Sequence, residues 1–341
     1  MKPIRSLALA VITACHVGAA LLVAALLASS GWNEARAQSS AFPDGRPITI
    51  VMTFPSGSGV DVAGRLIQEP LEKKLGAKVL IEYRPGAAGN IASEYVARAR
   101  PDGHTLLLGT SGTHAINAAL YKRLSFDVEA DFTPVATLID VSNVLTINPA
   151  VIDVRTVREF IDTVRANPGK YNFASTGNGT GTHLAFADFN ARAGLKMTHV
   201  PYKGGPEAML GVLQGDVCCI MNQVQTVLGQ WRAGKVRLLG VTTPKRIEVV
   251  SEIPTIAEGG LPGFSNYIWF GLLGPKDMDP AVTRRLNAAI NEVLEQPEVR
   301  QKLVSTGNTI RIETPEMFRE TLRRDRQRWG ELVRSIGVQI E

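Results

Sequence analysis

Apolar and polar positions along the chain fall into blocks that predict strands followed by helices. The clearest block begins with the apolar run 48–54 (ITIVMTF), which is typical of a buried strand. A turn of small residues follows at 55–59, and a helical pattern then places Val62 and Leu71 on one face. Such a turn exposes backbone N–H groups beside the positive end of a helix dipole, which suits the binding of an anion. The alternative is a tight connection that binds no ligand.

The same order of elements recurs along the chain. Further strands or extended segments are predicted at 78–83, 105–109, 143–148, 171–175, 198–203, 216–222, 236–243 and 267–274. Turns rich in glycine and hydroxyl groups follow two of the strands, at 110–113 and 176–182. Since parallel βαβ units place such turns at one edge of a sheet, the turns near Ser56 and Ser111 are expected to face one ligand.

The order of elements also suggests a domain organisation for this α/β chain. A new βα series starts after Pro149, and the extended segment 267–274 can return the chain to its first lobe. We therefore predict a first lobe at 43–145, a second lobe at 146–265, and a return to the first lobe over 266–341. The last part contains a long helix from Thr314, which is expected to pack across the lobes.

Residues 1–37 have a different composition from the rest. Lys2 and Arg5 precede an apolar stretch at 7–27, and Ala35-Arg36-Ala37 has the small-x-small pattern of a cleavage site. This pattern predicts a cleaved secretory signal peptide (1–37), a mature chain from Gln38, and a periplasmic location. An uncleaved membrane anchor and lipoprotein processing at Cys15 are the alternatives.

Composition excludes several classes of function. The 341 residues are 45% hydrophobic and 20% charged, which is ordinary for a globular protein long enough for two lobes. The net charge is +5 without a long basic run, and aromatic residues make up only 6%. These values argue against nucleic-acid binding.

Cys218 and Cys219 are the cysteines that follow the predicted leader, and they are neighbours. Strand alternation would point them to opposite faces, where we expect them to act as small buried hydrophobic side chains. A strained vicinal disulfide is the alternative. An exported chain without a disulfide framework must rely on a large core.

Motifs for cofactor chemistry and catalysis are incomplete. Gly57-x-Gly59 follows a strand, but Val62 stands where a dinucleotide-binding turn needs its third glycine. The chain has no Gly-x-Ser-x-Gly motif, and its histidines do not have metal-ligand spacing. We predict no catalytic residues, no cofactor and no metal site.

Asp61 and the pair Tyr202-Lys203 are further candidates for ligand contact. Asp61 lies in the first turn of its predicted helix, where it can cap the helix or bind a ligand amine or hydroxyl. Tyr202 and Lys203 lie at a strand end, where Lys203 can add positive charge or simply remain solvated.

Several motifs together resemble one family. They are Phe54-Pro55-Ser56-Gly57-Ser58-Gly59-Val60-Asp61, Arg84-Pro85-Gly86-Ala87-Ala88-Gly89-Asn90-Ile91, Pro101-Asp102-Gly103-His104-Thr105-Leu106-Leu107, Val200-Pro201-Tyr202-Lys203-Gly204 and Trp269-Phe270-Gly271-Leu272. In this order they resemble the substrate-binding proteins of tripartite tricarboxylate transporters, the Bug receptors, over nearly all of the predicted mature chain.

This resemblance implies a fold and a function. The fold is a two-lobed type II periplasmic binding protein with its ligand cleft between the lobes. The implied function is the capture of a small organic carboxylate, such as a di- or tricarboxylate or related acid, for a membrane permease. We expect a monomer that is not an enzyme. Presentation of the ligand to a signalling system is the alternative, and an exported enzyme acting on an organic acid is a minor one.

The resemblance also implies the ligand-binding loops, which coincide with the turns already identified. The predicted ligand-binding residues are Ser56, Gly57, Ser58, Gly59, Asp61, Thr110, Ser111, His114, Ser175, Thr176, Gly177, Thr180, Tyr202, Lys203, Gly204 and Asn222. Asn222 departs from the family, which often has an acid at this point, so the identity of the carboxylate stays open.

Overall fold

The structure is a computed structural model that describes residues 42–337. The predicted signal peptide and the alternatives raised for it lie outside these residues. The chain from Gly45 onward forms one compact unit. Among the described residues, no helix has the length and apolar character needed to span a membrane.

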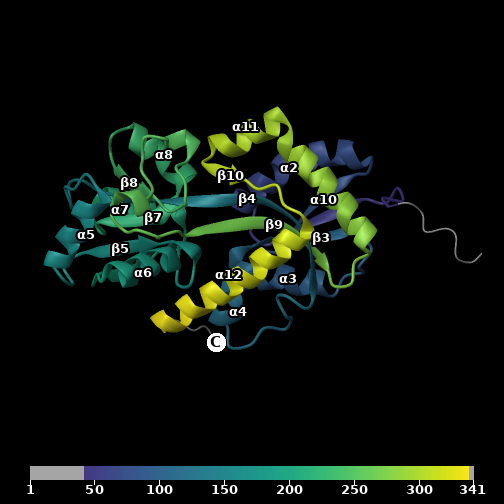
Figure 1. Ribbon diagram of the computed structural model, residues 1–341, viewed down its shortest axis with the longest axis horizontal. Helices are drawn as coiled ribbons and strands as arrows, with labels where there is room; N and C mark the ends of the chain where they lie inside the picture. Colours follow the sequence, from purple (N-terminus) through teal and green to yellow (C-terminus); the bar gives the residue numbers. More distant parts are fainter. Residues whose placement is uncertain (1–41, 338–341) are drawn as a thin grey trace, which may run out of the picture. The chain divides into compact units, whose positions relative to one another are not determined.

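Strands and helices alternate along the chain (Figure 1). The strands are β1 (Ile48–Met52), β2 (Val79–Tyr83), β3 (Thr105–Thr110), β4 (Phe132–Ile147), β5 (Asn172–Ser175), β6 (Thr198–Pro201), β7 (Cys219–Gln223), β8 (Arg237–Val241), β9 (Tyr267–Pro275) and β10 (Asn308–Ile310). The α-helices are α2 (Gly59–Leu75), α3 (Asn90–Ala97), α4 (Asn117–Leu120), α5 (Val157–Ala166), α6 (Gly181–Ala193), α7 (Gly205–Gln214), α8 (Val224–Arg232), α9 (Ile256–Gly259), α10 (Pro280–Glu295), α11 (Pro297–Ser305) and α12 (Pro315–Ile336). The short helical turns are η2 (Ala87–Gly89), η3 (Gly112–Ile116) and η4 (Glu248–Val250).

Side-chain caps fix where the helices begin. The Ser58 hydroxyl accepts a hydrogen bond from the backbone N–H of Asp61 at the start of α2, and Gly76 ends the helix in the left-handed conformation. Thr180 caps α6 in the same way, through the N–H of His183. The predicted face of α2 is right at Leu71 but wrong at Val62, which is exposed, because the buried face runs through Val60, Ile67, Leu71 and Leu75.

One mixed sheet connects the strands in the order β2-β1-β3-β9-β4-β7-β5-β6. Within each half of this order the strands β1–β3 and β5–β7 pair in parallel, as βαβ units require. The 16-residue strand β4 joins the two halves. Its first part pairs antiparallel with β9, and its last five residues pair with β7 and β8.

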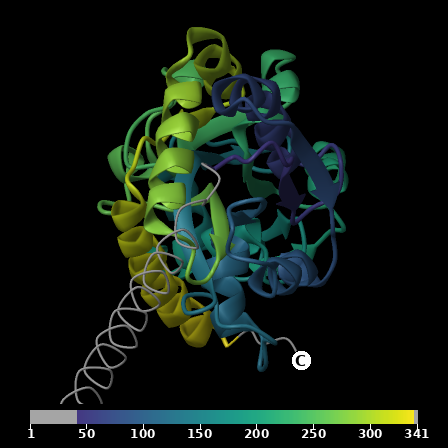
Figure 2. The same cartoon turned by 90° about the vertical axis from the view of Figure 1, so that its right-hand side faces the viewer.

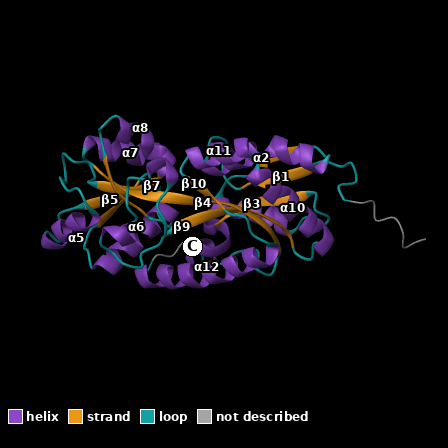
Figure 3. Ribbon diagram, turned by 45° about the horizontal axis from the view of Figure 1, so that its top comes forward, coloured by secondary structure: helices purple, strands orange, loops and turns teal. Residues whose placement is uncertain are grey.

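Helices cover both faces of the sheet. Figure 3 shows the strands as a central layer, with α2, α7, α8 and α11 on one side and α5, α6 and α12 on the other. Figure 2 shows α10 (yellow-green) lying beside α12 (yellow), and these two helices are in contact. Because both faces are covered, the inner strands are largely buried, as in α/β proteins generally, whereas the edge strands β2 and β6 are partly exposed.

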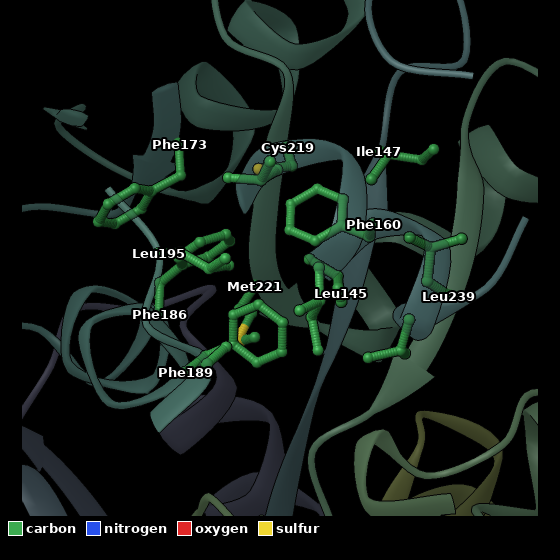
Figure 4. Close-up of a cluster of buried hydrophobic side chains, with 14 of the residues drawn as sticks. Leu145, Ile147, Phe160, Phe173, Phe186, Phe189, Leu195, Cys219, Met221 and Leu239 are labelled. Carbon is green, nitrogen blue, oxygen red and sulfur yellow. The ribbon is translucent and has the colours of Figure 1, made fainter. Parts of the chain in front are cut away.

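The apolar side chains gather in separate clusters. One cluster lies around β5, β7, α5 and α6, where the rings of Phe173 and Phe186 stack 4.2 Å apart (Figure 4). Another lies around β1, β3 and β9 and contains Trp269 and Phe318. A smaller cluster places Trp329 of α12 against η3, α4 and Leu184 of α6. The C-terminal helix therefore contacts elements from both halves of the sheet order.

Two further expectations need correction. β4 begins at Phe132, well before the predicted segment 143–148, because Pro134, Asp140 and two register shifts interrupt the apolar pattern that would reveal it.

Cys218 and Cys219 do not point to opposite faces. Cys218 precedes the first residue of β7, so strand alternation does not govern it, and the two Sγ atoms are 3.2 Å apart. Both cysteines are free and buried.

Candidate functional site

A cavity of about 330 Å³ lies where the start of α2, the segment η3–α4 and the turn before α6 meet. Its lining residues are Phe54, Ser58, Gly59, Val60, Ala88, Thr110, Gly112, Ile116, Asn117, Leu120, Tyr121, Asn143, Thr176, Asn178, Gly179, Thr180, Gly181, Thr182, Gln223, Ile268 and Phe270. These described residues include no charged side chain. Ligand pockets typically enclose about 300 to 1,000 Å³, so the cavity is large enough for a small organic molecule.

Two helices begin at this cavity. The first residues of α2 (Gly59, Val60) and of α6 (Gly181, Thr182) all line it. The N–H groups at the first two positions of a helix have no acceptor within the helix, and the caps Ser58 and Thr180 serve only the third position. Two pairs of backbone donors, each at the positive end of a helix dipole, therefore meet at one cavity.

The turn before α6 is held rigidly by its own side chains. The hydroxyl groups of Thr176, Thr180 and Thr182 lie 2.9 to 3.2 Å from one another. Behind the turn, the Gly179 N–H donates to Nδ1 of His183. Gly179 has a φ of +71° and lies so close to Leu120 that a Cβ atom would clash with it, which explains the glycine here.

The two histidines beside this turn stack on each other. The rings of His183 and His199 are 3.8 Å apart, and the Ser175 hydroxyl lies 2.6 Å from Nε2 of His199. Burial lowers the pKa of His183 to about 4, with a smaller contribution from His199. A neutral His183 ring can accept the Gly179 N–H, so the pair orders the turn. Neither histidine lines the cavity.

Asp61 lies at the start of α2, outside the cavity wall. Its carboxylate accepts the Gly57 N–H at 2.7 Å and is bonded to Arg65 at 2.9 Å and to the Tyr83 hydroxyl. Burial opposes ionisation, but these partners outweigh it and lower the pKa of Asp61. The carboxylate is thus charged and fully engaged in holding the turn 56–58.

Ser111 and His114 lie behind the cavity wall. Ser111 is fully buried, and its hydroxyl accepts a hydrogen bond from the Trp269 backbone N–H at 2.8 Å. His114 packs edge-on against Phe132, and burial lowers its pKa to about 3. Thr110 does line the cavity, with its hydroxyl accepting the N–H of Thr113.

The residues predicted after β6 and β7 also lie beyond the lining. Tyr202 packs against Gly211 of α7, where any Cβ atom would clash with its hydroxyl. The Lys203 N–H donates to Glu207, and Gly204 precedes the first residue of α7. Asn222 is buried, and its Oδ1 accepts the N–H of Gln223.

The structure thus brings only part of the predicted set to one place. Ser58, Gly59, Thr110, Thr176 and Thr180 line the cavity. The others lie outside its lining, namely Ser56, Gly57, Asp61, Ser111, His114, Ser175, Gly177, Tyr202, Lys203, Gly204 and Asn222. Ligand contact stays a prediction for every member of the set.

Sequence reasoning missed Asn143 and the apolar part of the wall. Asn143 lies within β4, and nothing in the sequence around it indicates that it lines a cavity. Ile116, Leu120 and Ile268 read as ordinary core residues. Across the described part of the chain, no group of His, Cys, Asp and Glu side chains is arranged to hold a metal ion.

Another hollow, of about 540 Å³, lies between β4, α10 and α12. It is lined by side chains of both charges, such as Asp127, Glu129, Arg284 and Arg326, and it contains none of the predicted ligand-binding residues. The cavity at the two helix starts is therefore the better candidate for a ligand site.

Comparisons with known proteins agree with this architecture. The family model of the tripartite tricarboxylate transporter family receptor matches residues 63–338. The chain is 33% identical to protein BugT of Bordetella pertussis over 297 residues, 87% of this chain and 91% of BugT.

Solved structures are similar as well. R. palustris Rpa4515 with adipate is 30% identical with a TM-score of 0.77, covering 87% of this chain and 99% of that one. MatC from Rhodopseudomonas palustris with bound malate is 31% identical with a TM-score of 0.72, covering 84% and 99%. Known periplasmic solute-binding proteins thus share the two-lobed α/β fold predicted for this chain. The chain belongs to the tripartite tricarboxylate transporter family of receptors, the family of the Bug solute-binding proteins.

Proposed function

We propose that the protein is a periplasmic receptor that captures a small organic carboxylate in the cavity between α2 and α6 and hands it to a membrane permease. The observation that carries this proposal is that two helices begin at one uncharged cavity, each with two N–H groups that have no acceptor within the helix. Such donors stabilise an anion without a cationic side chain. The carboxylates bound by the relatives, adipate and malate, support the same ligand class.

The proposed mechanism is capture followed by closure. β4 passes from its pairing with β9 to its pairing with β7 near Asn143, which lies in the cavity wall. A change in backbone dihedrals at this point and in the segment before β9 would move α6 relative to α2. Closure then brings both helix starts onto one ligand, the hinge motion typical of binding proteins.

Ligand binding can be tested by thermal unfolding of residues 38–341, the predicted mature chain. We expect one or a few carboxylates to raise the melting temperature, because a ligand at a hundred times its dissociation constant adds roughly 2.7 kcal/mol. The matched primary amides, which have the same shape without the charge, should produce no shift. A flat response to all acids, or equal shifts by acids and amides, would contradict the proposal.

Uptake measurements distinguish transport from signalling. Cells that lack the gene should lose uptake of the acid identified by thermal unfolding, and the gene supplied in trans should restore it. Unchanged uptake together with loss of a transcriptional response to the acid would favour the signalling alternative. Turnover of the acid by the purified protein would favour the enzyme alternative.

A further inference from the structure

Several polar side chains of the cavity wall are already bonded within the protein. Ser58 accepts the Asp61 N–H, and Gln223 accepts the side-chain amide of Gln225. The Asn117 amide donates to Ala88 and Asn90. The three threonine hydroxyls of the turn before α6 bond to one another. Besides Thr110 and Asn143, the other polar residues of the wall are Asn178, which is exposed, and Tyr121, which packs against the cluster around Trp329.

Apolar side chains form a large part of the wall. They are Phe54, Val60, Ile116, Leu120, Ile268 and Phe270. Ile116, Leu120 and Ile268 belong to the cluster built around Trp329, so they are fixed by packing behind them. Leu120 and Ile268 also press against Gly179 and Gly181 at the start of α6. This part of the wall cannot turn a polar group toward a ligand.

Asn143 differs from the bonded side chains. Its residue is 1% exposed, and neither Oδ1 nor Nδ2 has a hydrogen-bond partner among the described residues. Its backbone is fully used, since the N–H donates to the Thr242 hydroxyl and the C=O accepts from the Thr242 N–H. A buried amide without partners is unfavourable, so a group of this kind in a cavity wall indicates a partner that arrives with the ligand.

We propose that the cavity selects carboxylic acids with an unsubstituted hydrocarbon body over hydroxylated acids of the same charge, and that the Asn143 amide binds the polar end of the acid. This inference rests on the proposed function, because it names the substrate class of the same site. A hydroxyl group on the ligand body would lie against apolar side chains and lose its bonds to water. A wall of this kind rejects one added hydroxyl by about 10- to 100-fold.

The test is calorimetric titration of residues 38–341 with matched pairs of acids. The pairs are succinate and malate, tricarballylate and citrate, and phenylacetate and mandelate, in which only one hydroxyl differs. We expect at least one pair to bind, with the hydrocarbon acid at least tenfold tighter. A hydroxylated acid that binds as tightly as its partner overturns the inference and leaves the proposed function intact. If neither these acids nor any other carboxylate binds, both fail.

Two variants test the role of Asn143. Asn143→Ala should weaken the tightest acid of the panel at least tenfold. Asn266→Ala is the matched control, because Asn266 is equally buried and its amide is also unpartnered, but it does not line the cavity. It should leave affinity unchanged. An Asn143→Ala protein that melts cooperatively and binds as tightly as wild type overturns the assignment of Asn143. Equal weakening by both variants also overturns it.

Discussion

Asp61 shows how a residue chosen for ligand chemistry can serve the fold. Its carboxylate holds Gly57, Arg65 and Tyr83 around the turn that precedes α2. Asp61→Ala leaves the Gly57 N–H and the Tyr83 hydroxyl without this acceptor. Hydrogen bonds to a charged group contribute about 1.5 to 3 kcal/mol, so we expect a loss of that size in the free energy of unfolding, measured by urea titration. Glu69→Ala removes an exposed carboxylate of the same helix and should change stability by less than about 0.5 kcal/mol.

Ser111 provides a second test at the residue scale. Ser111→Ala would leave the Trp269 backbone N–H buried without its acceptor, which costs about 1 to 3 kcal/mol. The control is Ser305→Ala, whose hydroxyl is on an exposed part of α11. If Ser111→Ala unfolds at the same urea concentration as wild type, the bond to Trp269 does not stabilise the protein. Titration of the same variant with the bound acid also tests whether Ser111 contacts ligand.

Asp140 of β4 should make stability depend on pH. Burial raises its pKa from 3.8 to about 7, despite the opposing effect of Arg311, and Glu313 and Asp325 add to the increase. Tyr267 also faces this group. Between pH 4 and 7 the unfolded chain ionises this carboxyl while the folded protein keeps it protonated. The folded state therefore binds more protons, and the free energy of unfolding falls as the pH rises through this window.

The Asp140→Asn variant isolates this effect. Relative to the variant, wild type should lose on the order of 1 to 3 kcal/mol of unfolding free energy between pH 5 and pH 8. The comparison uses the difference between wild type and variant because two histidines add a pH dependence of their own. Burial lowers the pKa values of His114 and His183, so both proteins lose stability as the pH falls below 6.5. Glu69→Gln should follow wild type. Parallel curves for wild type and Asp140→Asn would contradict the assignment.

At the scale of elements, the contact between β9 and α12 depends on a glycine. A Cβ atom at Gly271 would lie 2.5 Å from the Phe318 ring and 3.1 Å from the carbonyl oxygen of Ala136. Gly271→Ala should therefore lower the free energy of unfolding by about 1 to 3 kcal/mol, measured by urea titration. Gly229→Ala is the control, because Gly229 of α8 faces open space and alanine favours a helix. Equal stability of the two variants would contradict this packing.

Elements with strong periodicity or clear caps were predictable, and elements defined by tertiary contacts were not. The strand, turn and helix around Ser58 follow from an apolar run, small residues and a cap. Most of β4 was not predicted, because it contains Pro134, Asp140 and buried threonines. Its extended conformation depends on pairing with strands on both of its edges. The three-residue β10 forms only because β4 offers it an edge.

At the scale of the whole molecule, the sequence indicated three of the segments that line the cavity but not which way their side chains point. The turns at 55–59, 110–113 and 176–182 do contribute lining residues. The sequence could not show that Asp61 and Ser111 bond within the protein, because their partners Tyr83 and Trp269 are distant in sequence. Asn143 became visible only when β4 placed it in the wall of a cavity.

The proposed function places the ligand in the cavity between the starts of α2 and α6. Gly59→Leu tests it most directly, because Gly59 lines the cavity and the atoms nearest to a Cβ at this position are the side-chain ends of Gln223 and Gln225 and the Phe270 ring, at 3.4 to 3.6 Å. Gly229→Leu adds the same side chain at an open position on α8.

The decisive measurement is calorimetric titration of both variants with the acid that most stabilises wild type. We expect Gly59→Leu to lose at least 30-fold in affinity while its unliganded melting temperature stays within a few degrees of wild type, and Gly229→Leu to bind normally. A folded Gly59→Leu protein that binds with wild-type affinity would contradict this location of the site.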